Sequence, residues 1–179
     1  MIIKNGHHSV IEHVNAIVLI TTGRGVTHEL VRHRLASFSQ ESTRYVRYGD
    51  VQYCEPLWYK DMDRKLAARM QRFLKEAQDL YSYMLGSGYR AEQAREVLPT
   101  MTKADIVTSA NAREWRHILH LRAGKRAHPE IRRVAKHILE LFYQSCPPLF
   151  EDIYAIIHGK EFEKVREHSN RLMGIISNV

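Results

Sequence analysis

Residues 32–45 read RHRLASFSQESTRY and form the most distinctive stretch of this 179-residue chain. Three arginines, one histidine and three serines lie between Arg32 and Arg44. Guanidinium groups, hydroxyls and backbone N–H groups from one loop can converge on a single anion. No helical stripe runs through residues 35–50, so we expect an ordered loop there. The stretch alone is also compatible with a solvated basic loop or a nucleic-acid-binding patch.

The segments around this loop predict a small sheet and several helices. Residues 14–21 (VNAIVLIT) are apolar and β-branched and predict a buried strand. Thr27 is the expected N-cap of a short helix that carries residues 28–32. Later helices are expected at residues 61–85, 91–97, 110–121, from 129 to the prolines at 147–148, and 150–157. The sequence therefore predicts an α+β fold, a helix-rich domain packed on a small mixed or antiparallel sheet.

Length and hydropathy predict one domain over residues 1–157, followed by a tail, residues 158–179, whose order the pattern leaves open. The longest apolar run, residues 16–20, is far shorter than the roughly 20 residues that span a bilayer. The first residues do not show the basic-then-apolar pattern of a cleavable leader, so we expect none. We expect a soluble, cytoplasmic protein without a membrane partner. The apolar stripe of the helix at residues 61–85 is expected to be core or subunit interface.

Charge and cysteine content narrow the class of partner. Lys and Arg number 27 against 20 Asp and Glu, a net charge of +7, which favours anionic partners such as nucleotides. Cys54 and Cys146 lie in unrelated contexts, and neither spacing is that of a disulfide framework or a metal site. Residues 7–13 (HHSVIEH) contain the nearest metal-ligand candidates, but no HExxH spacing is present. No metal is expected.

The loop sequence RHRLASFSQESTR fits the pattern RHR-x-x-S-x-x-x-x-S-x-R and resembles the signature of the flavin-dependent thymidylate synthases. Residues 6–13 (GHHSVIEH) resemble the family's GHxSxxEH stretch. Later blocks that resemble the family are residues 94–99 (AREVLP), 111–113 (NAR) and 121–132 (LRAGKRAHPEIR). Family members usually begin some tens of residues earlier, with a strand and helix, and we expect this chain to lack that opening unit.

The resemblance implies an enzyme that converts dUMP to dTMP by reductive methylation. It implies 5,10-methylenetetrahydrofolate as carbon donor, NADPH as reductant, bound FAD as cofactor, and a homotetramer with shared active sites. A nucleotide-binding relative without activity is one alternative. A basic nucleic-acid-binding module is another alternative. Four acidic residues interrupt the basic stretch, however, so no nucleic acid is expected. They are Glu29, Glu41, Asp50 and Glu55.

The resemblance also implies the site residues. The expected FAD contacts are Ser9, Arg32, His33, Arg34, Gln40, Asn111, Ala112, Arg113 and His117, with His7 as a further candidate. The expected dUMP contacts are Glu29, Leu30, Val31, Arg32, Gln40, Glu41, Ser42, Thr43, Arg44, Arg95 and Arg122. Arg44 and the loop amides are expected at the phosphate. Arg122 is the expected catalytic residue, holding the uracil ring and favouring loss of its N3 proton, because a guanidinium there stabilises the developing charge.

Local sequence leaves simpler roles open for several of these residues. Arg122 lies near the end of a predicted helix, where a cation is favourable in any case. Arg113 and His117 are one helical turn apart and can face one ligand, but His117 is also compatible with a surface histidine. Gln40 replaces a frequently acidic position of the family and His117 a frequent Asn; both substitutes keep hydrogen-bonding capacity.

Overall fold

The computed structural model describes residues 3–159 and divides into two compact units. The sheet unit is Ala16–Ala110, and the helical unit combines Met1–Asn15 with Asn111–Val179. The α+β prediction is confirmed. The prediction of a single domain over residues 1–157 stays a prediction. The tail expected at residues 158–179 lies, from residue 160 on, outside the described residues.

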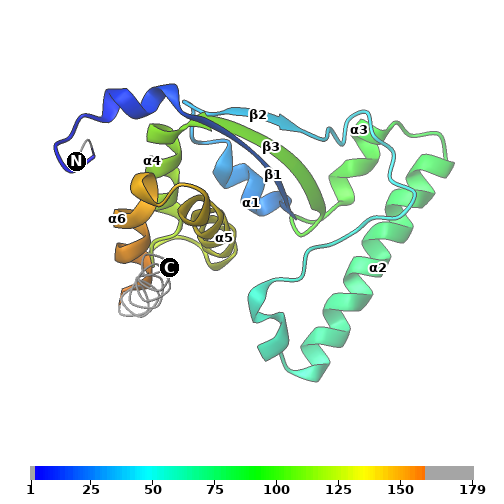
Figure 1. The fold of residues 1–179 in the computed structure, drawn as a ribbon. Coiled ribbons are helices and arrows are strands. Elements are labelled where there is room, and N and C mark those ends of the chain that lie inside the picture. Colours follow the sequence, from blue (N-terminus) through cyan, green and yellow to red (C-terminus); the bar gives the residue numbers. More distant parts are fainter. Residues whose placement is uncertain (1–2, 160–179) are drawn as a thin grey trace, which may run out of the picture. The chain divides into compact units, whose positions relative to one another are not determined.

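A three-stranded antiparallel sheet forms the centre of the sheet unit (Figure 1). Its strands are β1 (Asn15–Gly23), β2 (Ser37–Gln40) and β3 (Lys103–Asn111), in the order β1-β3-β2. The register of β2 on β3 runs from Ser37 opposite Ser109 to Gln40 opposite Ile106. The strand predicted at residues 14–21 is thus confirmed as β1.

Two parts of the sheet differ from the sequence prediction. The expectation of a loop throughout residues 35–50 is wrong, because β2 lies within it. The SFSQ sequence of β2 has little intrinsic strand preference, and the segment is extended because β3 supplies its hydrogen-bond partners. No element was predicted for β3, whose buried positions alternate but are filled largely by small or polar side chains: Ala104, Ile106, Thr108 and Ala110.

Helix α1 (Arg24–Leu30) follows β1 directly and lies against one face of the sheet (Figure 1). The prediction of an N-cap at Thr27 is wrong: Gly23 is the N-cap residue, and the Thr27 hydroxyl instead donates to the Arg24 carbonyl at 3.0 Å. The Arg24 N–H donates to the Thr102 carbonyl and the Gly25 N–H to the Thr100 carbonyl, each at 3.0 Å. These two hydrogen bonds hold the backbone at Arg24 and Gly25, so α1 begins earlier than the N-cap predicted at Thr27 implied.

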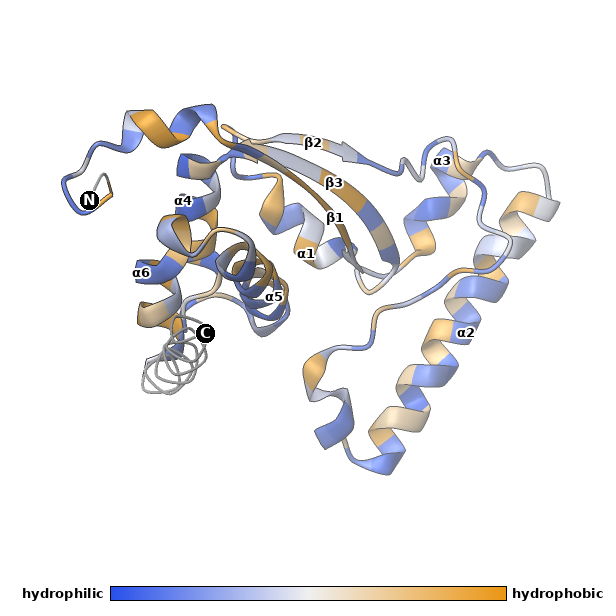
Figure 2. Cartoon of the chain, in the orientation of Figure 1, coloured by the Kyte–Doolittle hydropathy of each residue, from blue (hydrophilic) through white to orange (hydrophobic). Residues whose placement is uncertain are grey.

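The remaining helices of the sheet unit are α2 (Arg64–Gly86), α3 (Ala91–Ala94) and the 3-10 turns η2 (Leu57–Asp61) and η3 (Arg95–Val97). Asp63 caps α2 by accepting from the N–H groups of Lys65 and Leu66. Tyr81 of α2 is fully buried beside Val51 and Ala94. Figure 2 shows alternating apolar and polar bands along α2, although Leu66, Phe73 and Leu80 of the predicted stripe are about half exposed.

The helical unit contains η1 (His8–His13), α4 (Ala112–Arg122), α5 (Pro129–Ser145) and α6 (Pro147–His158). Trp115 is completely buried and meets the Phe142 ring edge to face, with ring centroids 5.2 Å apart. Such an aromatic pair stabilises the packing beyond the area it buries. Helix α6 begins at Pro147, not at residue 150 as predicted, because proline fits the first turn of a helix.

Among residues 3–159, no helix combines the length and the apolar character that crossing a membrane requires.

Candidate functional site

The RHR triplet forms a turn between α1 and β2. The His33 N–H donates to the Leu30 carbonyl at 3.1 Å, and the Ala36 N–H donates to the His33 carbonyl at 3.0 Å. His33 is buried, whereas Arg32 and Arg34 on either side are exposed. The expected ligand contacts that lie in the sheet unit are Glu29, Leu30, Val31, Arg32, His33, Arg34, Gln40, Glu41, Ser42, Thr43, Arg44 and Arg95.

Several polar side chains of the loop after the triplet make contacts inside the sheet unit. The Gln40 side-chain amide donates to the Thr27 hydroxyl at 3.1 Å. The Ser42 hydroxyl accepts from the Arg44 N–H at 3.3 Å, which makes a local turn. Arg44 lies 3.7 Å from the Glu92 carboxylate, and its side chain is 54% exposed. The loop is therefore ordered by its own contacts, with the Arg44 guanidinium largely open to solvent.

Thr43 and Arg95 come together from segments 52 residues apart. An Arg95 Nη1 N–H donates to the Thr43 hydroxyl at 3.5 Å, and Arg95 Nε lies 3.3 Å from the Glu96 carboxylate. Both residues line a pocket of about 290 Å³, which we call the cationic pocket. Its lining residues are Arg24, His28, Thr43, Arg95, Glu96, Leu98, Pro99 and Thr100.

Two residues of the cationic pocket, Arg24 and His28, were not predicted from the sequence. Arg24 opens α1 between two glycines, and its Nη1 is buried without a hydrogen-bond partner among the described residues. His28 lies one turn further along the same helix and is exposed. A glycine-flanked arginine directly after a buried strand was the available signal, but nothing local indicated that Thr100 would lie beside it.

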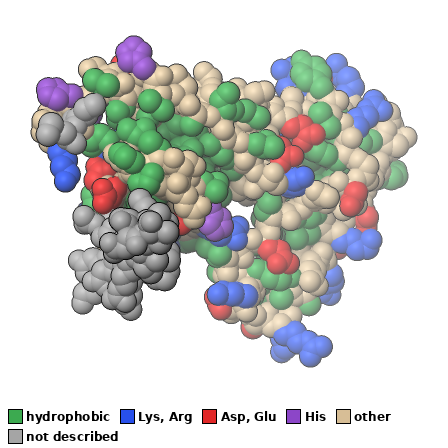
Figure 3. Space-filling model, in the orientation of Figure 1, with side chains coloured by type: hydrophobic (Ala, Val, Ile, Leu, Met, Phe, Trp, Pro, Cys, Tyr) green, Lys and Arg blue, Asp and Glu red, His purple; other side chains and the backbone are tan. Residues whose placement is uncertain are grey.

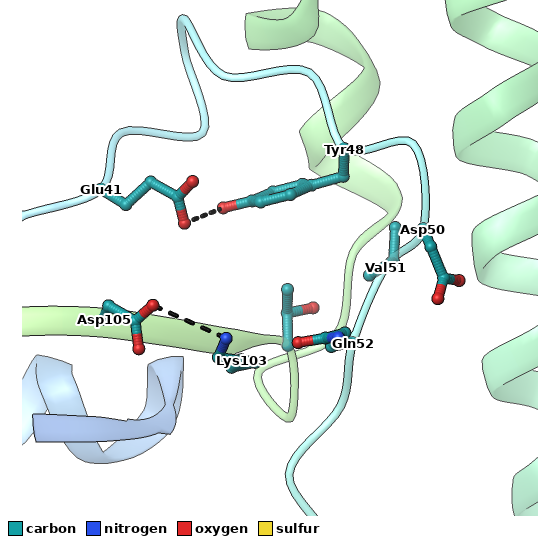
Figure 4. Close-up of a pocket in the computed structure, with 8 residues that line it drawn as sticks. Glu41, Tyr48, Asp50, Val51, Gln52, Lys103 and Asp105 are labelled. Carbon is teal, nitrogen blue, oxygen red and sulfur yellow. Dashed lines mark hydrogen bonds and ion pairs between the residues drawn. The ribbon is translucent and has the colours of Figure 1, made fainter.

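Glu41 faces a different space, which we call the acidic pocket (Figure 4). This pocket measures about 210 Å³ and is lined by Glu41, Tyr48, Asp50, Val51, Gln52, Thr102, Lys103 and Asp105. The Tyr48 hydroxyl donates to Glu41 at 3.1 Å, and Lys103 Nζ lies 3.6 Å from the Asp105 carboxylate. Burial, and next the Glu41 charge, raise the pKa of Tyr48 to about 12.

Other expected contacts lie in the helical unit: Ser9, Asn111, Ala112, Arg113, His117 and Arg122. Ser9 is exposed on η1, and His117 is exposed one turn after Arg113 on α4. Arg113 Nη1 forms an ion pair with Glu12 at 2.5 Å, which links η1 to α4. The predicted common face of Arg113 and His117 therefore exists on α4, with one guanidinium nitrogen already engaged.

The remaining residues of this group have structural positions of their own. The Asn111 side-chain oxygen accepts from the Glu114 N–H at 2.9 Å and so caps α4. Ala112 is buried, and Arg122 lies in the last turn of α4, where a cation complements the helix dipole. Burial raises the pKa of the Glu114 carboxyl, an effect that the nearby His117 charge opposes. The ligand roles of the expected residues in both units stay predictions.

Comparison with known proteins identifies the family. A family model described as thymidylate synthase complementing protein matches residues 1–148. A protein of Mycolicibacterium gilvum (strain PYR-GCK), named flavin-dependent thymidylate synthase, is 36% identical over 178 residues, which cover 89% of this chain and 71% of that protein.

Two further relatives carry the same name. The Corynebacterium efficiens protein is 36% identical over 167 residues, covering 84% of this chain and 66% of the relative. The Pyrococcus furiosus protein is 36% identical over 143 residues, covering 78% of this chain and 59% of the relative. The chain thus spans about two thirds of the length of these relatives. It belongs to the thymidylate synthase complementing protein family, and the resemblance to the flavin-dependent thymidylate synthases is confirmed.

Proposed function

We propose that this protein is an FAD-dependent thymidylate synthase. The reaction is the reductive methylation of dUMP to dTMP, with 5,10-methylenetetrahydrofolate as carbon donor and NADPH as reductant. The observation that carries the proposal is the contact between Thr43 and Arg95 at the cationic pocket. It joins two separate segments, residues 32–44 and 94–99, that resemble the family's motifs.

In this proposal the nucleotide is bound mainly by the sheet unit. Arg95 and the Thr43 hydroxyl bind the phosphate, because guanidinium groups bind phosphate oxygens through charge-assisted hydrogen bonds. Arg44 and the amides of its loop add further donors. The other proposed dUMP contacts are Glu29, Leu30, Val31, Arg32, Gln40, Glu41, Ser42 and Arg122. Arg122 is the proposed catalytic residue and stabilises negative charge on the uracil ring.

The donors expected for FAD fit an anionic dinucleotide. Arg113 and His117 occupy one side of α4, and Ser9 presents an exposed hydroxyl on η1. The Glu12 contact uses Nη1 of Arg113, and a guanidinium has five N–H donors, so the remaining ones are available for a ligand. The other proposed FAD contacts are Arg32, His33, Arg34, Gln40, Asn111 and Ala112. When bound, FAD supplies the redox chemistry, passing the reducing equivalents of NADPH to the new methyl group.

We also propose a homotetramer in the cytoplasm. Ile17 and Leu19 of β1 are 73% and 66% exposed on one side of the sheet, and an apolar surface of this kind favours association. Neither Cys54 nor Cys146 is in a disulfide, which agrees with a reducing compartment. Light scattering that finds a persistent monomer at micromolar concentration would count against the assembly.

The purified protein tests the proposed function directly. We expect a yellow protein, or one that takes up added FAD, whose visible spectrum shifts on addition of dUMP. With NADPH and 5,10-methylenetetrahydrofolate it should form dTMP, detected by chromatography. A protein that binds dUMP and FAD but forms no dTMP would be an inactive relative. A protein that takes up no FAD and binds DNA would overturn the proposal in favour of a nucleic-acid-binding module.

A nucleic-acid-binding role would require a continuous basic stripe. On the face shown in Figure 3, Lys and Arg side chains are interspersed with acidic ones, particularly around α2. The mixing of charges around α2 does not favour a nucleic-acid-binding surface on that face.

A further inference from the structure

The backbone of Arg24 is held firmly at the cationic pocket. Its N–H donates to the Thr102 carbonyl at 3.0 Å, and the next N–H, of Gly25, donates to the Thr100 carbonyl at 3.0 Å. A Cβ at Gly23 would lie 3.4 Å from the Thr100 carbonyl oxygen, so the two segments pass close together. The Arg24 side chain is therefore fixed at its base beside Thr100, another residue of the pocket wall.

The guanidinium of Arg24, in contrast, has a nitrogen without a hydrogen-bond partner among residues 3–159, although its charge acts on nearby Tyr48. Its Nη1 is buried and makes no hydrogen bond to any of these residues. Buried polar groups almost always have partners, and leaving one without a partner destabilises the folded protein. The neighbouring arginines differ in this respect: Arg95 contacts Thr43 and Glu96, and Arg44 contacts Glu92.

A missing acceptor in a pocket of this charge points to an anionic ligand. Arg24 and Arg95 bring two positive charges to the wall, against one negative charge from Glu96. The Thr43 hydroxyl and the exposed His28 ring add hydrogen-bonding groups that suit phosphate oxygens. Nη1 is closed to solvent, so an anion in the pocket would bind other N–H groups of the Arg24 guanidinium and neutralise the delocalised charge that Nη1 shares.

We propose that Arg24 is a phosphate-binding residue, which together with Arg95 and Thr43 holds the 5′-phosphomonoester of the nucleotide substrate. The inference rests on the proposed function and extends it, because Arg24 lies outside the motifs that carry the family resemblance. It makes the cationic pocket a determinant of specificity: the pocket selects a nucleoside monophosphate over the corresponding nucleoside.

Calorimetric titration of the full chain with dUMP and with deoxyuridine tests the inference. In Arg24→Gln we expect the Kd for dUMP to rise tenfold or more, since a hydrogen bond to a charged group is at stake. The Kd for deoxyuridine should stay within about twofold, because the nucleoside lacks the phosphate. Arg24→Lys keeps the charge but loses the planar fork, so an intermediate rise is expected.

Arg72→Gln is the matched control, because Arg72 is an exposed arginine of α2 in the same unit. It should leave both affinities unchanged, and thermal unfolding should show each variant folded. Should Arg24→Gln not fold, Arg24→Lys decides the matter. Wild-type binding of dUMP that is equal in the Arg24 variants would overturn this inference and leave the proposed function intact. A wild-type chain that binds no dUMP would overturn the proposed function itself.

Discussion

The cationic pocket and the acidic pocket lie in the same unit and draw on the same loop, yet their polar groups are satisfied differently. In the acidic pocket every carboxylate has a partner within the chain. Tyr48 donates to Glu41, Gln78 donates to Asp50 at 2.9 Å, and Thr21 donates to Asp105 at 2.6 Å. In the cationic pocket, Nη1 of Arg24 is buried and has no hydrogen-bond partner among the described residues.

The difference separates a structural network from a binding site. A ligand in the acidic pocket would have to replace hydrogen bonds that these groups already make with one another. Its binding would therefore gain little free energy. A guanidinium without an acceptor gains a charge-assisted hydrogen bond when an anion binds, and no hydrogen bond within the protein has to break. Glu41 and Thr43 are only two positions apart, so one loop contributes to both pockets, and the proposed dUMP contact of Glu41 would have to share its carboxylate with the Tyr48 hydroxyl.

The largest effect is expected from Arg95→Ala. The variant removes the guanidinium that bridges Thr43 and Glu96, and dUMP affinity should fall about 30- to 100-fold, in line with hydrogen bonds to charged groups. Calorimetric titration measures the change. Affinity that stays within twofold of wild type would remove the cationic pocket from the nucleotide site.

Arg44→Ala should weaken dUMP binding less, by about tenfold, since exposed charges are screened by water and salt. The Arg44 side chain is 54% exposed and lies at 3.7 Å from its acidic neighbour. Titrations at two salt concentrations check this explanation, because the loss should shrink at high salt. A loss that exceeds that of Arg95→Ala would show that Arg44 is the main phosphate contact instead.

Tyr48→Phe examines the acidic pocket alone. It removes the hydroxyl that donates to Glu41 and should lower the free energy of unfolding by about 1 kcal/mol, as measured by urea denaturation. The Kd for dUMP should remain within about twofold. If instead the nucleotide affinity fell as far as in Arg95→Ala, the contrast between the two pockets would be wrong.

The smallest effect concerns pH. The pKa of Tyr48 is raised from 10.0 to about 12 in the folded protein, so between these values the folded state holds a proton that the unfolded state has released. The contribution of the raised Tyr48 pKa to the free energy of unfolding is fully present below pH 10 and is lost as the pH rises towards 12. The gap in unfolding free energy between wild type and Tyr48→Phe should therefore narrow from pH 9 to pH 11. A constant gap would contradict the raised pKa.

Helices with a clear apolar period could be predicted from the sequence, and elements defined by their partners could not. Helix α5 places Ile131, Ala135, Ile138 and Leu139 in the interior at helical spacing. Strand β3 alternates as regularly, but Ala and Thr at its buried positions give little hydropathy contrast. Strand β2 is extended because β3 pairs with it, a contact between segments far apart in the chain.

The residues of the candidate site likewise include some that the sequence predicted and others whose role depends on distant parts of the chain. The loop at residues 32–44 and Arg95 were found because their motifs resemble a family. Arg24 was not found, because its relevance depends on Thr100 and Thr102, which meet the start of α1 only once β1 and β3 pair. The Tyr48–Glu41 bond likewise depends on how the loop closes, which the six residues between them do not determine.

A crystal structure of the protein with dUMP tests the central claim most directly. We expect the phosphate in the cationic pocket, with its oxygens about 3 Å from guanidinium nitrogens of Arg24 and Arg95 and from the Thr43 hydroxyl. A phosphate bound in the acidic pocket or elsewhere on the chain, with Arg24 and Arg95 in contact with no part of the nucleotide, would contradict it.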